Sequence, residues 1–376
     1  MQNAKAKAGH NFFYSLLRWP HGRNDPIRSR FRGCLVGGAV GDALGAPIEF
    51  MNHTEIIQSF GPEGIRDFVD RIGSITDDTQ MTLFTAEGML RAHVQGLAGF
   101  SGVTDHAYMR WLGTQGQRSV VPFSPDGYLW EQKELHSWRS PGHTCLRALK
   151  SKKTFGDPAN NDSKGCGGVM RVAPVGLYTS HNKSIQGIEE HCFTIAAEIA
   201  GLTHGHPSGQ WPAGVLALLV MRCLGDTPLI DALAEAKEIL KKRDQHDETL
   251  AAILKAESLA ASGLTPDAYQ LEKLGGGWVA EEALAIGIYC ALVARDFEHG
   301  ITLAVNHGGD SDSTGSIAGN LLGAMLGMDA IPKRWTRHLE LLDVIQRVAD
   351  DLYEYPGWNI GKNVHDRNIR ARYPGW

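Results

Sequence analysis

The chain has 376 residues and a formal net charge of -5 at pH 7. This length exceeds the usual size of a single domain, yet helical enzymes can extend one core by adding layers of helices, so we expect one domain in preference to two. The negative charge gives no general attraction to a phosphate backbone, which argues against nucleic acid as the partner. With 43% hydrophobic and 21% charged residues, the composition is that of a globular protein with a large core.

The six cysteines lie far apart in the chain and form no CxxC pair. This spacing favours neither a zinc ribbon nor a small disulfide scaffold, and it fits a reducing cytoplasm, where we expect the protein to stay. No apolar run reaches the roughly 18 residues of a membrane span. The segment from Asn11 to Trp19 is too short and too polar at its end for a signal peptide, so we expect no membrane association.

The first 30 residues differ in composition from the rest of the chain. They carry six lysines and arginines against the single acid Asp25, and an aromatic cluster lies within residues 12–19. We predict a basic and aromatic N-terminal extension over residues 1–30, followed by one domain over residues 31–376. The alternative is a solvated tail without a function.

From Phe31 onward the sequence favours helices. Long stretches rich in Ala, Leu and Ile cover residues 188–201, 213–224 and 281–296, and Gly, Pro and Asn separate them. Patterns that alternate apolar and polar residues, as strands do, are scarce. The sequence therefore predicts a mostly helical protein.

Two series of glycines recur at a spacing of four residues, which keeps each series on roughly one face of a helix. Such a face lets two helix backbones approach closely, although each glycine costs about 1 kcal/mol of helix propensity. We predict two central helices packed tightly beneath a site, the alternative being two ordinary packed helices. The series are Gly33, Gly37, Gly41 and Gly45, and Gly315, Gly319, Gly323 and Gly327.

Two acidic segments each precede a helical pattern. The run Thr76-Asp77-Asp78-Thr79 leads into apolar residues at helical spacing, which places two carboxylates at a helix N-terminus. Capping explains one of these acids but not both. The run Gly308-Gly309-Asp310-Ser311-Asp312 likewise places two carboxylates at the start of the second glycine-lined helix.

Convergence of these two segments would bring four mutually repelling carboxylates together. Protons or cations must then offset the repulsion, and hard oxygen ligands suit Mg²⁺ or Mn²⁺ better than Zn²⁺. The second segment is neither an EF-hand loop, because the glutamate at position 12 is missing, nor a P-loop, because no Gly-Lys-Ser/Thr follows. The sequence therefore predicts a site for divalent cations, with two ions plausible.

Two further features have mainly structural interpretations. His204 and His206 do not share a helical face and have no Cys or His pair to complete a zinc site, so we expect structural or supporting roles for them. The sequence Tyr-Pro-Gly-Trp occurs at residues 355–358 and again at 373–376. Turn formation with aromatic packing is the simplest interpretation, and stacking on a nucleotide base is the alternative.

Five segments together resemble the ADP-ribosylglycohydrolase family, and they are especially similar to its dinitrogenase-reductase-activating type. The resemblance extends from about Phe31 to Trp335, and the segments occur in the order found in the family. They are residues 41–50 (GDALGAPIEF), 76–79 (TDDT), 170–174 (MRVAP), 203–204 (TH) and 308–312 (GGDSD).

The resemblance implies an all-α fold, an orthogonal multi-helix bundle of the ADP-ribosylglycohydrolase type with a central binuclear metal site. Two Mg²⁺ or Mn²⁺ ions are expected there. Ser313 stands where the family usually has threonine, and it presents the same oxygen with more rotamer freedom. The implied ligands are Thr76, Asp77, Asp78, Asp310, Asp312 and Ser313.

The implied activity is metal-dependent hydrolysis of the N-glycosidic bond of ADP-ribosyl-arginine on a target protein, with release of ADP-ribose. Glu49 matches the acidic residue that lies beside the scissile bond in several members, and Asp42 or Glu49 would handle protons as the catalytic acid/base. Because family members also act on O-linked serine and other ADP-ribosyl substrates, the acceptor remains open.

We also expect a set of substrate-binding residues. Glycine-rich amides and a cation suit a pyrophosphate, although Arg171 reads equally well as a structural residue of the core. The chain departs from the family at two places: Cys166 replaces a common asparagine, and Ser140 replaces the aspartate of the activating type. The expected substrate-binding residues are Gly165, Cys166, Gly167, Gly168, Arg171 and His204.

A second hypothesis is that the protein acts by binding. Some family members are immunity proteins against ADP-ribosyltransferase toxins, and the extension over residues 1–30 could occlude the active site of such a toxin. This role is compatible with hydrolase activity.

Overall fold

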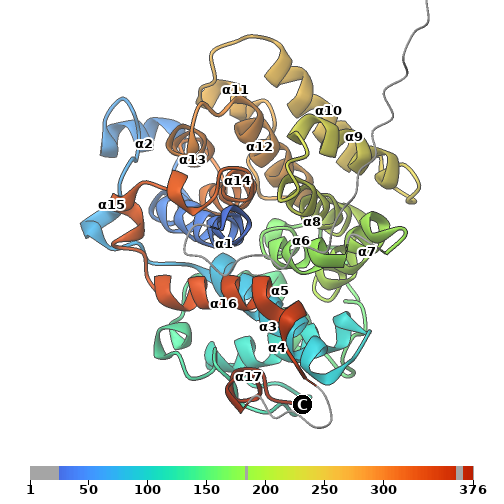
Figure 1. Cartoon of the computed structure of the whole chain (residues 1–376). Helices are drawn as coiled ribbons and strands as arrows, with labels where there is room; N and C mark the ends of the chain where they lie inside the picture. Colours follow the sequence, from blue (N-terminus) through green and yellow to red (C-terminus); the bar gives the residue numbers. More distant parts are fainter. Residues whose placement is uncertain (1–24, 183–184, 361–366, 376) are drawn as a thin grey trace, which may run out of the picture.

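The structure, a computed structural model, describes residues 25–182, 185–360 and 367–375. Within these ranges the only β-type pairings are isolated bridges, between Gly73 and Leu339 and between Gly165 and Val279. Figure 1 shows helices arranged around a central pair, α1 and α14. The predicted all-α fold class is confirmed.

The α-helices are α1 (Pro26–Gly45), α2 (His53–Phe60), α3 (Asp77–Gln95), α4 (Phe100–Thr114), α5 (His143–Lys150), α6 (Ala173–Thr179), α7 (Ile188–Gly201), α8 (Trp211–Cys223), α9 (Leu229–Leu240), α10 (Asp247–Ala261), α11 (Ala268–Glu272), α12 (Ala280–Val293), α13 (Phe297–Val305), α14 (Ser311–Leu326), α15 (Lys333–Thr336), α16 (Leu342–Glu354) and α17 (Arg367–Arg372). Short 3₁₀ helices are η1 (Ala46–Ile48), η2 (Val69–Arg71), η3 (Lys133–His136), η4 (Cys166–Gly168), η5 (Ser180–Asn182), η6 (Pro207–Gly209), η7 (Met328–Ala330) and η8 (Tyr355–Gly357).

The apolar stretches recognised in the sequence form helices. The stretch 188–201 is α7, and the stretches 213–224 and 281–296 correspond to α8 and α12 with small shifts at their ends. Helix α8 begins earlier than predicted because Pro212 occupies its first turn, where proline needs no hydrogen-bond partner for its nitrogen.

Helices α1 and α14 pack backbone against backbone in antiparallel directions. A Cβ atom added to Gly33 would lie 2.5 Å from the carbonyl oxygen of Gly323, and one added to Gly37 would lie 2.5 Å from that of Gly319. Gly41 is similarly close to the backbone of its opposite glycine on α14. Because any side chain would separate the helices, the prediction of two tightly packed central helices is confirmed.

Helix α1 is anchored to α16 by arginines near its start. Asp25 caps α1 by accepting a 2.9 Å hydrogen bond from the amide of Ile27. The guanidinium of Arg32 then donates two hydrogen bonds, of 2.7 and 2.6 Å, to the carboxylate of Asp350. Because α1 begins at Pro26, the boundary predicted between residues 30 and 31 falls inside this helix. Residues 1–24 lie outside the described part of the chain, so the binding hypothesis for the extension stays a prediction.

The two Tyr-Pro-Gly-Trp sequences lie close together and pack as aromatic clusters. Tyr355 stacks on Tyr178 with ring centroids 4.3 Å apart, and Trp358 stacks on Tyr373 at 5.8 Å. The guanidinium of Arg91 donates hydrogen bonds to the carbonyl oxygens of residues 374 and 375. These contacts confirm the structural interpretation of both sequences over their described residues.

Across the described ranges, length and apolar content together single out no individual helix as a possible membrane span. The bent pair formed by Pro26–Ile48 and His53–Phe60 meets both criteria only when its members are taken together.

Replacing Gly37 by alanine tests the backbone contact between α1 and α14. We expect Gly37→Ala to lower the free energy of unfolding by about 1–3 kcal/mol, as overpacking typically does. Gly102→Ala is the matched control, because Gly102 lies in the first turn of α4 and a Cβ there would meet nothing within 4 Å. Alanine at this position should raise the free energy of unfolding by about 0.5–1 kcal/mol. Urea denaturation of both variants measures this, and equal effects would contradict the packing argument.

Candidate active site

Acidic residues from two helix N-termini converge on one cavity. Helix α3 supplies Asp77 and Asp78, and α14 begins at the capping residue Asp310 and supplies Asp312 in its first turn. All four are buried and line a cavity of about 470 Å³. The positive ends of both helix dipoles point toward these carboxylates, which offsets part of their repulsion. The predicted convergence of the two segments is confirmed.

Local hydrogen bonds hold these carboxylates at the helix starts. The hydroxyl of Thr76 caps α3 by accepting a 3.3 Å hydrogen bond from the amide of Asp78. In α14, the amide of Ser313 donates to the carboxylates of Asp310 at 3.4 Å and Asp312 at 2.9 Å. Capping thus orients the predicted metal ligands. Ser313 lines the cavity, whereas Thr76 is buried next to Asp77 and is not among the lining residues.

Asp42 joins the end of α1 to the start of α3. Its carboxylate accepts 3.1 Å hydrogen bonds from the amides of Thr76 and Thr79, together with a short one from the Thr79 hydroxyl. Burial raises the pKa of Asp42 to about 6, and the hydrogen bonds from Thr79 and Thr76 oppose that rise. Asp42 does not line the cavity. The contacts of Asp42 hold the N-terminus of α3, and its predicted role in proton transfer stays a prediction.

Glu49, just after η1, does line the cavity. One oxygen each from Glu49, Asp310 and Asp312 lie within 4.8 Å of one another, which is close enough to share a cation. Burial raises the pKa of Glu49 to about 8, and the negative charges of Asp310, Asp77 and Asp42 add to the rise. Of the two residues predicted as catalytic, Glu49 is the one that can reach a substrate.

The electrostatics of the cluster fit a divalent cation. Burial raises the pKa of Asp77 to about 7, although the 3.0 Å hydrogen bond that its carboxylate accepts from the amide of Gly142 acts to lower this pKa. Burial and neighbouring negative charges raise the pKa values of Asp78 and Asp312 well above the usual range. One buried carboxylate oxygen of Asp78, Oδ2, has no hydrogen-bond partner. A cation would supply the missing partner and neutralise the charge, and these hard oxygen donors suit one.

The glycine-rich segment around η4 forms another part of the cavity wall. Gly165, Cys166 and Gly167 line it, whereas Gly168 is buried behind them. The thiol of Cys166 donates a 2.8 Å hydrogen bond to Oδ2 of Asp310. Burial and the charge of Asp310 raise the pKa of this thiol well above its usual range, which keeps it protonated. Cys166 therefore contacts an expected metal ligand directly.

Arg171 lies in the core and not in the cavity wall. Its guanidinium donates to the Thr203 hydroxyl at 2.7 Å and to the Ile199 carbonyl at 3.1 Å, and it sits 4.4 Å from the centre of the Tyr108 ring. These contacts correspond to the structural alternative for Arg171, and its predicted contact with a pyrophosphate stays a prediction.

His204 lines the cavity next to this core. Its Nδ1 lies 2.8 Å from the Thr203 hydroxyl oxygen. Burial and the charge of Arg171 lower the pKa of His204 to about 3, so the ring is neutral near pH 7. A Cβ added to Gly167 would lie 3.1 Å from Cε1 of this ring, so a larger residue there would press against His204.

Several residues at the cavity were not identified from the sequence. The amide of Gly142 contacts Asp77, and His143 and Trp138 lie in the same wall. The rings of Phe50 and Trp278 stack at the mouth, with centroids 5.6 Å apart. A weak signal for this pair existed, because Phe50 directly follows Glu49 and Trp278 follows three glycines.

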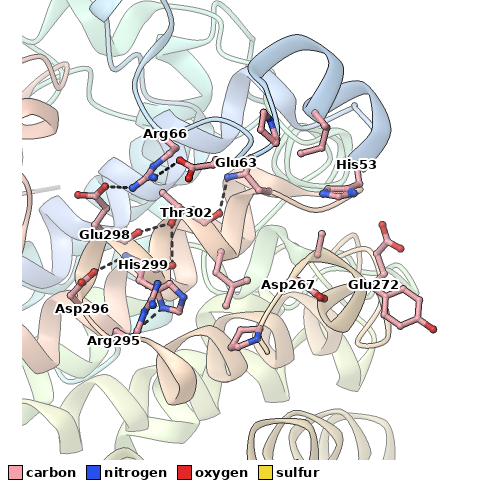
Figure 2. Close-up of a pocket in the computed structure, with 17 residues that line it drawn as sticks. His53, Glu63, Arg66, Asp267, Glu272, Arg295, Asp296, Glu298, His299 and Thr302 are labelled. Carbon is pink, nitrogen blue, oxygen red and sulfur yellow. Dashed lines mark hydrogen bonds and ion pairs between the residues drawn. The ribbon is translucent and has the colours of Figure 1, made fainter. Parts of the chain in front are cut away.

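A larger cavity, of about 860 Å³, lies between α2, α11 and α13 (Figure 2). Several of its charged groups stabilise the local structure: Arg66 forms ion pairs with Glu63 and Glu298, and the carboxylate of Asp296 caps α13 by accepting a hydrogen bond from the amide of His299. None of the predicted site residues lines it. The carboxylate-lined cavity is therefore the better candidate for an active site.

Comparison with known proteins agrees with this assignment. The family model described as ADP-ribosylglycohydrolase matches residues 23–360. An ADP-ribosyl-[dinitrogen reductase] glycohydrolase of Rhodospirillum rubrum is 27% identical, with 84% of this chain and 92% of that protein aligned. An ADP-ribosylarginine hydrolase, Tri1, of Pseudomonas putida is 24% identical, with 86% and 78% aligned. A solved structure titled ADP-ribosylglycohydrolase-related protein complex superposes with a TM-score of 0.62 at 26% identity, covering 88% of this chain and 99% of that one.

Neutralising Asp78 separates metal binding from folding. Because its carboxylate is buried among like charges with one unpaired oxygen, we expect Asp78→Asn to abolish Mn²⁺ binding in isothermal titration calorimetry while leaving the metal-free protein at least as stable. Asp351→Asn is the matched control, since that buried carboxylate is paired with Arg372 and the Tyr373 hydroxyl. The control should lower the free energy of unfolding by about 3 kcal/mol. Intact Mn²⁺ binding in Asp78→Asn would refute the assignment.

The raised pKa of Glu49 predicts a pH-dependent stability of the metal-free protein. The carboxyl group of Glu49 loses its proton near pH 4.3 in the unfolded chain but only near pH 8 in the folded protein. The contribution of the protonated Glu49 to the free energy of unfolding is therefore full below about pH 4.3 and is lost as the pH rises through about 8. In EDTA, wild type should lose more stability between pH 5 and 8 than Glu49→Gln. Urea denaturation at both pH values tests this, and parallel losses in the two proteins would contradict it.

Proposed function

The chain belongs to the ADP-ribosylglycohydrolase family, and on that premise we propose that it hydrolyses the N-glycosidic bond of ADP-ribosyl-arginine on a target protein. The products are ADP-ribose and the unmodified arginine. The observation that carries this proposal is the convergence of five carboxylates, from Glu49 and the starts of α3 and α14, on one cavity with a glycine-rich wall.

The proposed cofactor is a pair of divalent cations, Mg²⁺ or Mn²⁺. Such ions orient ribose hydroxyls and polarise a water molecule when they are bound. The carboxylates at the starts of α3 and α14 have the charge, the burial and the unpaired oxygen to hold them. The proposed ligands are Thr76, Asp77, Asp78, Asp310, Asp312 and Ser313.

In this proposal the cavity walls orient the substrate around the scissile bond. The ribose attached to the acceptor lies over the carboxylate floor, and the pyrophosphate runs along Gly165, Cys166 and Gly167, where the small residues leave room for it. His204, neutral and buried on one side, shapes the wall beside Gly167.

Glu49 is the residue that handles protons. During hydrolysis the bond between the anomeric carbon and the guanidine nitrogen breaks, a water oxygen bonds to that carbon, and the leaving nitrogen gains a proton while the water loses one. Glu49 is only partly buried and lies at the cavity, so it can exchange protons with both substrate and solvent. Asp42 supports this step indirectly, by fixing α3.

The identity of the acceptor amino acid is the most specific part of the proposal. Arginine is favoured by the similarity to proteins whose names state dinitrogen reductase and ADP-ribosylarginine as their substrates. Ser140, in place of the aspartate of the activating type, lies in the cavity wall and is compatible with a different acceptor such as serine. Cytoplasmic location and a toxin partner for the N-terminal extension remain proposals.

Release of ADP-ribose from arginine-modified and serine-modified proteins tests the function. With Mg²⁺ or Mn²⁺ added, we expect wild type to act on the arginine linkage, and Asp77→Asn and Asp312→Asn to be about 1,000-fold slower, which corresponds to about 4 kcal/mol of transition-state stabilisation. Asp247→Asn is the control, because that side chain is 92% exposed on α10. Release from the serine linkage alone would replace the proposed acceptor, and release from neither would exclude this hydrolase activity.

A further inference from the structure

Two large aromatic side chains are exposed at the mouth of the cavity. Phe50 is 76% exposed and Trp278 is 44% exposed, yet their rings stack on each other with an interplanar angle of 21°. Both side chains line the cavity that holds the carboxylate cluster. Exposed aromatic surface of this kind, next to a concave polar site, is typical of a place where a ligand binds.

Both rings are held by the segments that build the active site. Phe50 directly follows Glu49, and the turn that carries both is closed by a 2.9 Å hydrogen bond from the amide of Met51 to the carbonyl of Ile48. The carbonyl of Trp278 accepts a 3.2 Å hydrogen bond from the amide of Cys166 in the glycine-rich wall. The pair therefore has a defined position relative to the expected site of bond cleavage.

The connectivity of the substrate indicates which of its groups the pair contacts. The acceptor side chain is bonded to the anomeric carbon, so it must lie close to the residue that protonates it as it leaves. In the proposed mechanism that residue is Glu49, and Phe50 directly follows it in the chain. Adenine lies at the opposite end of the substrate, beyond the pyrophosphate. The rings thus belong to the acceptor side of the cavity.

The chemistry of the surroundings favours a planar cation. A guanidinium group stacks on aromatic faces, and each such contact contributes about 0.5–2 kcal/mol depending on desolvation. The cavity beside the pair contains the carboxyl groups of Glu49, Asp310 and Asp312, which add a negative potential. A serine acceptor has neither a charge nor a flat surface to use here.

We propose that Phe50 and Trp278 form the acceptor subsite, in which their rings hold the guanidinium of the ADP-ribosylated arginine. This proposal rests on the proposed function. It makes the aromatic pair a specificity determinant for arginine, separate from the groups that bind ADP-ribose.

Substitutions at Trp278 test the subsite through two separate readouts. For Trp278→Leu we expect kcat/KM on an ADP-ribosyl-arginine peptide to fall about tenfold, which equals about 1.4 kcal/mol, while the Kd for ADP-ribose, which has no acceptor, changes less than twofold. Trp278→Phe keeps an aromatic face and should restore most of kcat/KM. Tyr269→Leu is the matched control, because Tyr269 is an aromatic residue that is 67% exposed and does not line this cavity. This variant should match wild type in both readouts.

Each result decides between alternatives. Equal loss of ADP-ribose affinity and of kcat/KM in Trp278→Leu would mean that the rings hold the nucleotide, and unchanged kcat/KM would mean that they hold nothing; either overturns the subsite while the proposed function stands. If wild type itself fails to act on the arginine linkage, the proposed function falls and the subsite falls with it. Mn²⁺ binding by Trp278→Leu, measured by calorimetry, should equal that of wild type and verifies that the variant is folded.

Discussion

The backbone contact between α1 and α14 is the constraint on which the site depends. Glycines on both helices bring carbonyl groups of one against Cα atoms of the other, so the axes cannot slide or separate without losing the fit. Helix α1 ends at the turn that carries Glu49, and the antiparallel α14 starts at Asp310. The contact therefore places Glu49, four residues after the end of α1, close to the metal-ligand candidates at the start of α14.

The third element of the site is tied to the same pair by a polar contact. Asp42 on α1 accepts hydrogen bonds from the start of α3, which carries Asp77 and Asp78 to the cavity. Burying so many acids together is unfavourable, and it raises the pKa of each. The fold tolerates this because helix dipoles oppose the repulsion and because a bound cation can neutralise it. Stability is thus given up locally to bring these carboxylates together, as the proposed cation site requires.

The floor and the rim of the cavity differ in how they are built. The floor comes from helix starts, which are rigid, whereas the rim comes from connecting segments that carry Ser140, Phe50 and Trp278. Such segments vary more easily than packed helices and commonly carry specificity. The departures from the family fit this division, since Cys166 and Ser140 both lie in non-helical or 3₁₀ segments next to the expected substrate.

The sequence by itself determined the helical fold class, the central glycine-lined pair and the two acidic helix starts, because spacing of three to four residues and capping preferences are local properties of a chain. It did not separate Asp42 and Arg171, which brace the site, from Glu49, which faces the cavity. Whether a side chain points into a cavity depends on contacts with other helices, such as those of Asp42 with Thr76 and of Arg171 with Thr203. The contact between Phe50 and Trp278 was likewise decided only by the tertiary structure, because the two residues are 228 positions apart in the chain and their adjacent residues gave only a weak signal.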